Sequence, residues 1–478
     1  MKEYTSASSA GRGQAPSSRG GLAGLSLAIL LSSLATSVAN VSLPTLTEVF
    51  SASFQSVQWV MIASLLSVTT FIVSVGRLGD IMGRRRLLLA GMVVFSVAST
   101  LCGVSPSLHW LIAARALQGL GAAIMTALAM AFVGEIVPKA KIGSAMGMLG
   151  SMSSLGTALG PSLGGILITF MGWRSIFLVN LPFGVVALAL AYRCLPVDRR
   201  VSVPAQTRFD VLGTILLACT LASYALAMTL GRGRFSEANL ALLGAAGLSG
   251  SIFVFAQSRV RSPLIPLSMF KNLELSASLV VSILVSTVLM ATLFVGPFYL
   301  SVGLGLDTAH VGLTMSVGPL VVATTAIPAG RIADRVGALP MTVIGLICIL
   351  TGSIGFVLVS PALGVPGYLV PVAFITAGYA FFQTANNTSV MADVPHEQRG
   401  VVSGLLNLSR NLGLISGASA MGAIFATVSG ADDVKKATSD AIAHGMHATY
   451  GIAAGLILLA IAIVLGSRFL VRATESRV

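Results

Sequence analysis

Arg115 and Arg410 are the two charged residues that lie inside long apolar segments of this sequence, so their positions most strongly suggest chemistry. A guanidinium in an apolar medium is costly unless it faces a wet cavity or a partner. All 16 acidic residues lie at or near segment ends, which excludes the carboxylate cluster that a membrane-embedded enzyme would need. We expect a substrate-binding cavity instead, lined by the arginines and these neutral polar side chains: Asn40, Gln118, Tyr299, Gln383, Asn386, Asn387 and Asn407.

Metal, cofactor and nucleotide chemistry find no support in the residue pattern. None of the six lysines follows a glycine, so the chain has no Gly-Lys-Ser/Thr phosphate loop and no direct use of ATP is expected. The four cysteines are scattered through the apolar runs without Cys-x-x-Cys spacing or a nearby histidine, which is typical of small apolar core residues. They are Cys102, Cys194, Cys219 and Cys348. We therefore expect no metal and no cofactor.

Composition identifies the elements that must position these side chains. The 478 residues are 55% hydrophobic and only 9% charged, with a mean hydropathy of +0.92. A soluble domain has about 25% charged residues, and a membrane helix needs about 20 apolar ones. We predict an all-α polytopic membrane protein with 14 transmembrane helices. They span approximately 21–43, 57–77, 87–105, 109–133, 143–170, 175–195, 210–231, 239–258, 275–301, 311–331, 339–360, 366–392, 400–429 and 444–470.

The basic residues predict how these helices are oriented. With the N-terminus inside, 22 of the 29 Lys and Arg residues fall on cytoplasmic segments and only five fall outside. This asymmetry is the positive-inside rule. It predicts a multi-pass protein of the cytoplasmic (inner) membrane with both termini cytoplasmic. The net charge of +13 is then explained by anionic lipid in the bilayer, without a nucleic-acid partner.

An internal repeat divides the predicted helices into two halves. GRLGDIMGRR (76–85) returns as GRIADRVG (330–337), an offset of 254 residues. Five glycines from 143 to 165 return from 400 to 422, an offset of 257. We predict a disordered cytoplasmic tail (1–20), two six-helix halves (21–195 and 275–470), a linker with two extra helices (196–274) and a cytoplasmic tail (471–478).

The repeated loop resembles the segment between helices 2 and 3 of the major facilitator superfamily. The matching residues are Gly76, Leu78, Asp80, Gly83, Arg84 and Arg85, and the second copy supplies Gly330, Asp334 and Arg335. In that family the loop is a cytoplasmic latch that forms and breaks during alternating access. An aspartate there can cap the N-terminus of a neighbouring helix, and the arginines can pair with acids on the same face, such as Asp80 or Glu135. Taken alone, the arginines at 84–86 are equally well explained as basic residues that keep this loop on the cytoplasmic side.

Three segments, GWRSIFLVNLPFG (172–184), FDVLG (209–213) and NLSRNLG (407–413), resemble the fourteen-helix drug:proton antiporters of that superfamily. LIAARALQGLGAAI (111–124) is similar to helix 4 of the superfamily, which implies a part in proton transfer for Arg115; a structural hydrogen-bond hub is the alternative. Helix 5 is similar to the antiporter motif of the superfamily's exporters, in which small residues allow close helix approach and proline bends the helix. The matching residues are Gly147, Gly156, Gly160, Pro161, Gly164 and Gly165.

One position departs from the resemblance. LATSVANVSLP (34–44) is similar to the helix 1 motif of these antiporters, but Ala35 stands where the motif has an aspartate. Proton antiport usually relies on a buried carboxyl, and dicationic substrates need a buried anion. We therefore expect neutral or anionic amphiphiles to be better substrates than multivalent cations. The coupling ion stays open, since boundary acids or the substrate itself could carry the proton.

The resemblance implies a secondary active transporter that exports amphipathic small molecules or drugs by alternating access and proton-coupled antiport. Its partners would be the lipid bilayer, the substrate and protons, and we expect a monomer. The alternative is a transporter of the same fold that imports or exports an organic anion metabolite. The helix 5 motif favours export.

Overall fold

The computed structural model describes residues 18–475 except 53, 199–209, 230–236, 261–262, 307, 393, 396–397 and 430–437. The regular secondary structure of these residues is helical. The α-helices are α1 (Ser18–Val49), α2 (Phe54–Met82), α3 (Arg84–Gly103), α4 (Leu108–Ile136), α5 (Ile142–Met171), α6 (Ser175–Leu178), α7 (Asn180–Cys194), α8 (Val211–Thr229), α9 (Glu237–Arg259), α10 (Leu273–Phe298), α11 (Thr308–Val336), α12 (Ala338–Leu358), α13 (Gly364–Ala392), α14 (Arg399–Val428) and α15 (Ser439–Glu475). Short helical turns are η1 (Lys139–Lys141), η2 (Leu267–Lys271), η3 (Tyr299–Gly303) and η4 (Pro361–Leu363).

The helices confirm the predicted all-α membrane architecture. In the described part of the chain, 13 helices are long and apolar enough to cross a membrane, or 14 if the bent α5 counts as one span. α5 bends by 42° between Gly160 and Leu163. Proline at 161 removes a backbone donor at this point, which accounts for the bend.

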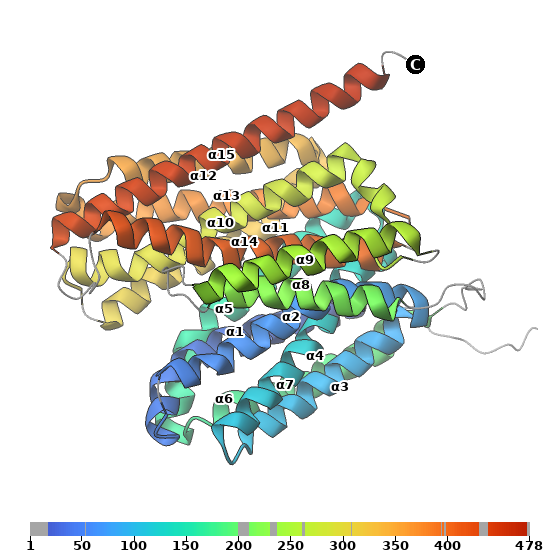
Figure 1. The fold of residues 1–478 in the computed structure, drawn as a ribbon, viewed down its shortest axis with the longest axis horizontal. Helices are drawn as coiled ribbons and strands as arrows, with labels where there is room; N and C mark the ends of the chain where they lie inside the picture. Colours follow the sequence, from blue (N-terminus) through green and yellow to red (C-terminus); the bar gives the residue numbers. More distant parts are fainter. Residues whose placement is uncertain are drawn as a thin grey trace, which may run out of the picture.

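The helices form two groups with a separate pair between them (Figure 1). α1–α7 pack together on one side and α10–α15 on the other, each around its own apolar core. α8 and α9 run side by side across the front of the view, where the two groups meet. A further apolar cluster joins residues of the first group to α14 and to the α8–α9 pair.

Glycines set the corresponding turns in the two groups. Gly83, between α2 and α3, has φ +100°, and Gly337, between α11 and α12, has φ +96°. Only glycine adopts this region freely. The two positions are 254 residues apart, the offset of the repeat.

The structure differs from the predicted tails at both ends. α1 begins at Ser18, inside the segment 1–20 that we expected to be disordered; residues 1–17 lie outside the described part. α15 continues to Glu475, so residues 471–475 of the expected C-terminal tail are helical, and residues 476–478 are outside the description. Arginine, alanine and glutamate in this segment (Arg472, Ala473 and Glu475) are good helix formers.

Candidate functional site: the interface between the two helix groups

Glycine-lined contacts join the two groups along two seams. We call the end of the bundle with the turns at Gly83 and Gly337 the basic end. The N-terminal part of α1 and the C-terminal part of α15 also lie at this end. Gly21 of α1 lies against Ile136 at the end of α4, and Arg468 of α15 pairs with Glu274 at the start of α10. The first seam is α5 against α11, and the second is α14 against α2.

The two seams are built alike. A Cβ at Gly143 would lie 2.7 Å from the Gly330 carbonyl oxygen, and one at Gly147 would lie 2.2 Å from that of Ala326. In the second seam, a Cβ at Gly76 would lie 2.1 Å from the Gly400 carbonyl oxygen. Such contacts leave no room for any side chain. The repeat seen in the sequence therefore brings its glycine-rich and loop elements together in pairs.

Asp334 fastens the first seam electrostatically. Its carboxylate accepts hydrogen bonds from the backbone nitrogens of Gly143 (2.8 Å) and Ser144 (3.0 Å) and from the Ser144 hydroxyl (2.7 Å). These donors lie at the N-terminus of α5, where free N–H groups and the helix dipole favour a negative charge. Asp334 thus ties α11 to α5 by a charged helix cap. Arg335, which follows Asp334 in this loop copy, is exposed.

Charged contacts also accompany the second seam. Arg84, which is buried, pairs with Glu135 at 3.3 Å, as expected from the sequence. Arg399, at the start of α14, donates to the Gly134 carbonyl of α4 in the other group. Asp80 occupies the position equivalent to Asp334, but its side chain lies outside the described atoms.

Asp198 is a functional candidate that sequence reasoning missed. It follows α7, and its carboxylate accepts from the backbone nitrogens of Arg85 (2.9 Å) and Arg86 (3.1 Å), capping α3. The Arg85 side chain donates to the Tyr192 carbonyl of α7. This cap has the same chemistry as that of Asp334 but stays within one group. No local signal in the sequence pairs residues 85 and 198.

The antiporter-motif glycines of α5 divide their contacts between two helices. Gly147 faces α11, whereas Gly156 and Gly160 face α1, with a Cβ position at Gly156 only 2.6 Å from the Leu30 carbonyl oxygen. Gly164 is buried and Gly165 has open space beside it. The side chain of Pro161 lies outside the described atoms. Gly413 and Gly417 of α14 meet α10 in the corresponding way.

Arg115 forms a buried polar network inside the first group. Its side chain is 1% exposed. It donates to the carbonyls of Val60 (3.0 Å) and Ala35 (3.4 Å) and to Gln118, and its second terminal nitrogen has no partner. The Gln118 amide donates to Ser99 at 2.7 Å. Within the described residues no carboxylate pairs with this guanidinium, so α1, α2 and α4 meet at an uncompensated positive charge.

The other predicted cavity residues whose side chains the structure describes do not join this network. Gln383 donates to Asn387 at 3.0 Å, and both lie on α13. Tyr299 is fully buried beside Tyr368, with ring centroids 6.3 Å apart. The remaining positions are Asn386, which is buried with an unpartnered side-chain nitrogen; Arg410, which is half-buried with an unpartnered Nε; and Asn40, whose side chain lies outside the described atoms.

Asn407 lies where the two groups meet. Its amide donates to the Ser403 carbonyl and to the sulfur of Met130, each at 2.9 Å. The Ser403 hydroxyl donates to the Ala127 carbonyl of α4. Asn407 is therefore the predicted cavity residue that the structure places directly at the boundary between the groups.

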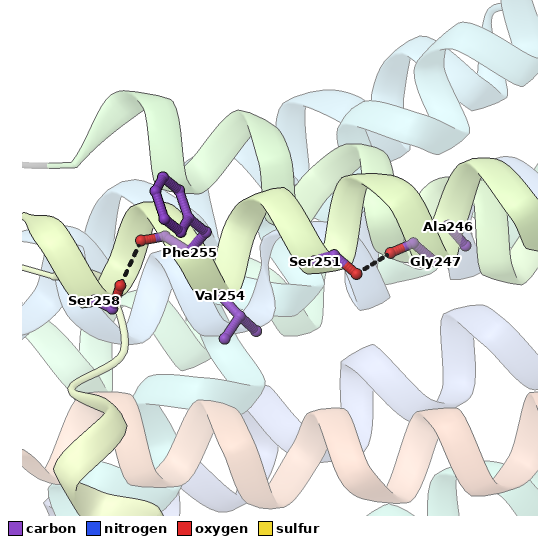
Figure 2. Close-up of a pocket in the computed structure, with 7 residues that line it drawn as sticks. Ala246, Gly247, Ser251, Val254, Phe255 and Ser258 are labelled. Atoms are coloured by element: carbon purple, nitrogen blue, oxygen red, sulfur yellow. Dashed lines mark hydrogen bonds between the residues drawn. The ribbon is translucent and has the colours of Figure 1, made fainter.

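A groove on the surface of α9 offers little polar chemistry (Figure 2). The Ser251 and Ser258 hydroxyls donate to the carbonyls of Gly247 and Phe255 on the same helix. α9 is mostly exposed on this side, so we assign the groove to lipid rather than to a binding site. Its lining is Ala246, Gly247, Gly250, Ser251, Val254, Phe255 and Ser258. No group of three or more His, Cys, Asp or Glu side chains that could hold a metal occurs in the described parts.

Known proteins resemble the chain over nearly its whole length. The profile of the Major Facilitator Superfamily matches residues 25–418. The riboflavin transporter RibZ of Clostridioides difficile is 30% identical over 462 residues, 95% of this chain and 97% of RibZ. The multidrug resistance protein Stp of Mycobacterium tuberculosis is 30% identical over 392 residues, 81% of this chain and 72% of Stp.

Solved structures agree on the fold. The human organic anion transporter MFSD10 superposes with a TM-score of 0.68 at 18% identity, covering 94% of this chain and 100% of that one. The profile match, the full-length relatives and the paired glycine seams all lead to one assignment. The chain is a multi-pass membrane transporter that belongs to the Major Facilitator Superfamily.

Proposed function

We propose that this transporter exports amphipathic small molecules across a bacterial cytoplasmic membrane by alternating access, acting as a monomer. The two moving bodies are residues 21–195 and 275–470. The basic end is cytoplasmic, because the Lys and Arg residues concentrate there. The supporting observation is the pair of glycine seams at that end, which holds the groups together around Asp334.

The seams define what must change during transport. Opening the basic end requires Gly143 and Gly147 to leave α11, and Gly76 to leave Gly400. The Asp334 cap and the Arg399–Gly134 bond then break together, and water replaces their partners. Because packed glycine contacts are either made or lost, the interface favours two discrete arrangements over a continuum.

The substrate class follows from the charge inside the first group. Arg115 carries a positive charge without a carboxylate partner among the described residues, and Ala35 supplies only a backbone carbonyl. This field opposes multivalent cations and tolerates neutral or anionic amphiphiles. We propose export of such compounds, and the relative Stp is named as a multidrug resistance protein.

A second candidate is transport of an organic anion metabolite without a role in drug resistance. Two observations favour it: the uncompensated Arg115, and a relative named as a riboflavin transporter. This function would use the same seams and the same alternating access. Only the substrate and the direction of net flux would differ.

Sided flux in proteoliposomes tests the proposal. Wild type, Arg115→Gln and Asp334→Asn are reconstituted with an imposed proton gradient, and an anionic and a cationic fluorescent amphiphile are compared. We expect gradient-driven export that prefers the anionic probe, with both variants impaired. Flux that ignores the gradient would refute proton antiport, and net import would favour the metabolite transporter.

A further inference from the structure

The α8–α9 pair touches both moving groups. α8 packs against α9, against α2 of the first group and against α14 of the second. In Figure 1 it lies between α14 above and α2 below. Since α2 and α14 form one of the two seams, α8 lies across the line along which the groups must separate. It cannot keep both contacts unchanged during transport.

The hydrogen bonds of the pair lead to the second group. Tyr224 of α8 bonds through its hydroxyl to that of Ser416 on α14. At the basic end, the Gln257 side chain of α9 accepts from the backbone nitrogen of Ile265, in the segment that leads into α10. Ile265 and its neighbour Leu264 are buried. The pair is thus bonded to the second group within the membrane, through α14, and at the basic end to the segment that leads into α10.

The pair itself is held together by directional bonds. Asp210 caps α8 through the Gly213 nitrogen (2.7 Å) and accepts from the Gln257 side chain of α9 (2.5 Å). Thr220 of α8 bonds Ser249 of α9 at 3.0 Å. These contacts make the two helices one unit.

The contact with α2 is of a different kind. Leu217 and Leu221 of α8 join the apolar cluster that contains Ile72 and Val73 of α2. Apolar side chains against one another, in surroundings as apolar as lipid, gain little from any particular register. Sliding at this contact therefore costs less than breaking the polar bond to α14.

We propose that the α8–α9 pair moves as part of the C-terminal moving body and slides on α2 when the basic end opens and closes. This inference rests on the proposed alternating access. Tyr224 is a positioning residue: it holds α8 on α14 and touches no substrate in this account.

Distances between spin labels in the full-length protein test the inference. The labels replace exposed, lipid-facing residues: Phe255 on α9, Val93 on α3 and Ile344 on α12. The Val93–Ile344 pair reports on the two groups. Double electron–electron resonance is recorded for wild type and for Asp334→Asn, which weakens the first seam. The distance distributions are compared in shift and in width.

We expect the Phe255–Val93 distances to follow the Val93–Ile344 reference, while the Phe255–Ile344 distances stay narrow and unchanged. A Phe255–Ile344 distribution that follows the reference, or that varies together with Phe255–Val93, would overturn the inference. If Asp334→Asn does not shift the Val93–Ile344 distances, the widths of the wild-type distributions are compared instead. The Phe255–Val93 distribution should then be as broad as the Val93–Ile344 distribution, and the Phe255–Ile344 distribution should be narrow. The reference alone tests alternating access, so the two proposals can fail separately.

The tyrosine has its own matched control. Tyr224→Phe should broaden the Phe255–Ile344 distribution. Thr220→Val removes a bond inside the pair and should leave the Phe255–Ile344 distribution narrow. Equal distributions in Tyr224→Phe and wild type would show that the hydroxyl does not hold α8 on α14.

Discussion

Replacing Asp334 with asparagine should shift the transporter toward a state with an open basic end. In the closed arrangement the carboxylate accepts three hydrogen bonds at the N-terminus of α5. Asparagine keeps one acceptor oxygen and turns its NH₂ group toward the remaining donors. Losing charged bonds and the dipole interaction costs about 2–3 kcal/mol in the closed state alone, because water replaces them in the open state.

This free energy corresponds to a roughly 30- to 150-fold change in the ratio of closed to open molecules. Spin labels at Val93 and Ile344 would show it as a new population in the distance distribution. Asp198→Asn is the matched control, since that carboxylate caps α3 through two backbone nitrogens within one group. It should lower the melting temperature without moving the groups. An unchanged distribution in Asp334→Asn, or an equal shift in Asp198→Asn, would refute the reasoning.

Three further changes test other parts of the account. Ala35→Asp should place a carboxylate near Arg115, which should stabilise the protein by about 1–3 kcal/mol in thermal unfolding and raise the ratio of cationic to anionic probe transport. Ala35→Asn should change neither the stability nor this ratio, and an unchanged ratio in Ala35→Asp would mean that Arg115 does not set the charge preference. Gly330→Ala should abolish transport, because its Cβ would lie 2.2 Å from the Gly143 carbonyl oxygen; Gly312→Ala on the same helix, with nothing within 4 Å, is the control, and equal flux from both would contradict the seam. Arg399→Met should weaken the closed basic end through loss of its bond to Gly134, and a distance distribution identical to wild type would show that this bond contributes nothing.

Repetition in the sequence predicted more than composition did. The 254-residue offset matched Gly83 with Gly337 and Asp80 with Asp334, and both turns adopt the same positive φ. Positive φ and close backbone approach demand glycine, so these features leave a readable trace. The Arg84–Glu135 pair was also predictable, because both residues belong to the same charged face.

Contacts between distant segments were not predictable in this way. Asp198 reaches α3 across 112 residues, and Arg399 reaches α4 across 265. Tyr224 and Ser416 are ordinary residues of apolar helices, and only the packing of α8 on α14 brings them together. Of the polar residues that we grouped into one cavity, Gln118 lies beside Arg115, whereas Gln383 and Asn387 bond each other on α13. Helical segments of similar composition give no information about which faces meet.

Reciprocal accessibility of two single cysteines tests alternating access most directly. One replaces Ser403, which is fully buried at the second seam, and the other replaces Thr36, which is exposed on α1. In an otherwise cysteine-free protein with the native Asp334, a membrane-impermeant thiol reagent should modify position 36 quickly from the external side and position 403 slowly from the cytoplasmic side. Adding Asp334→Asn should slow the first rate and raise the second. Rates that rise together, or a position 403 that stays unreactive, would contradict the account.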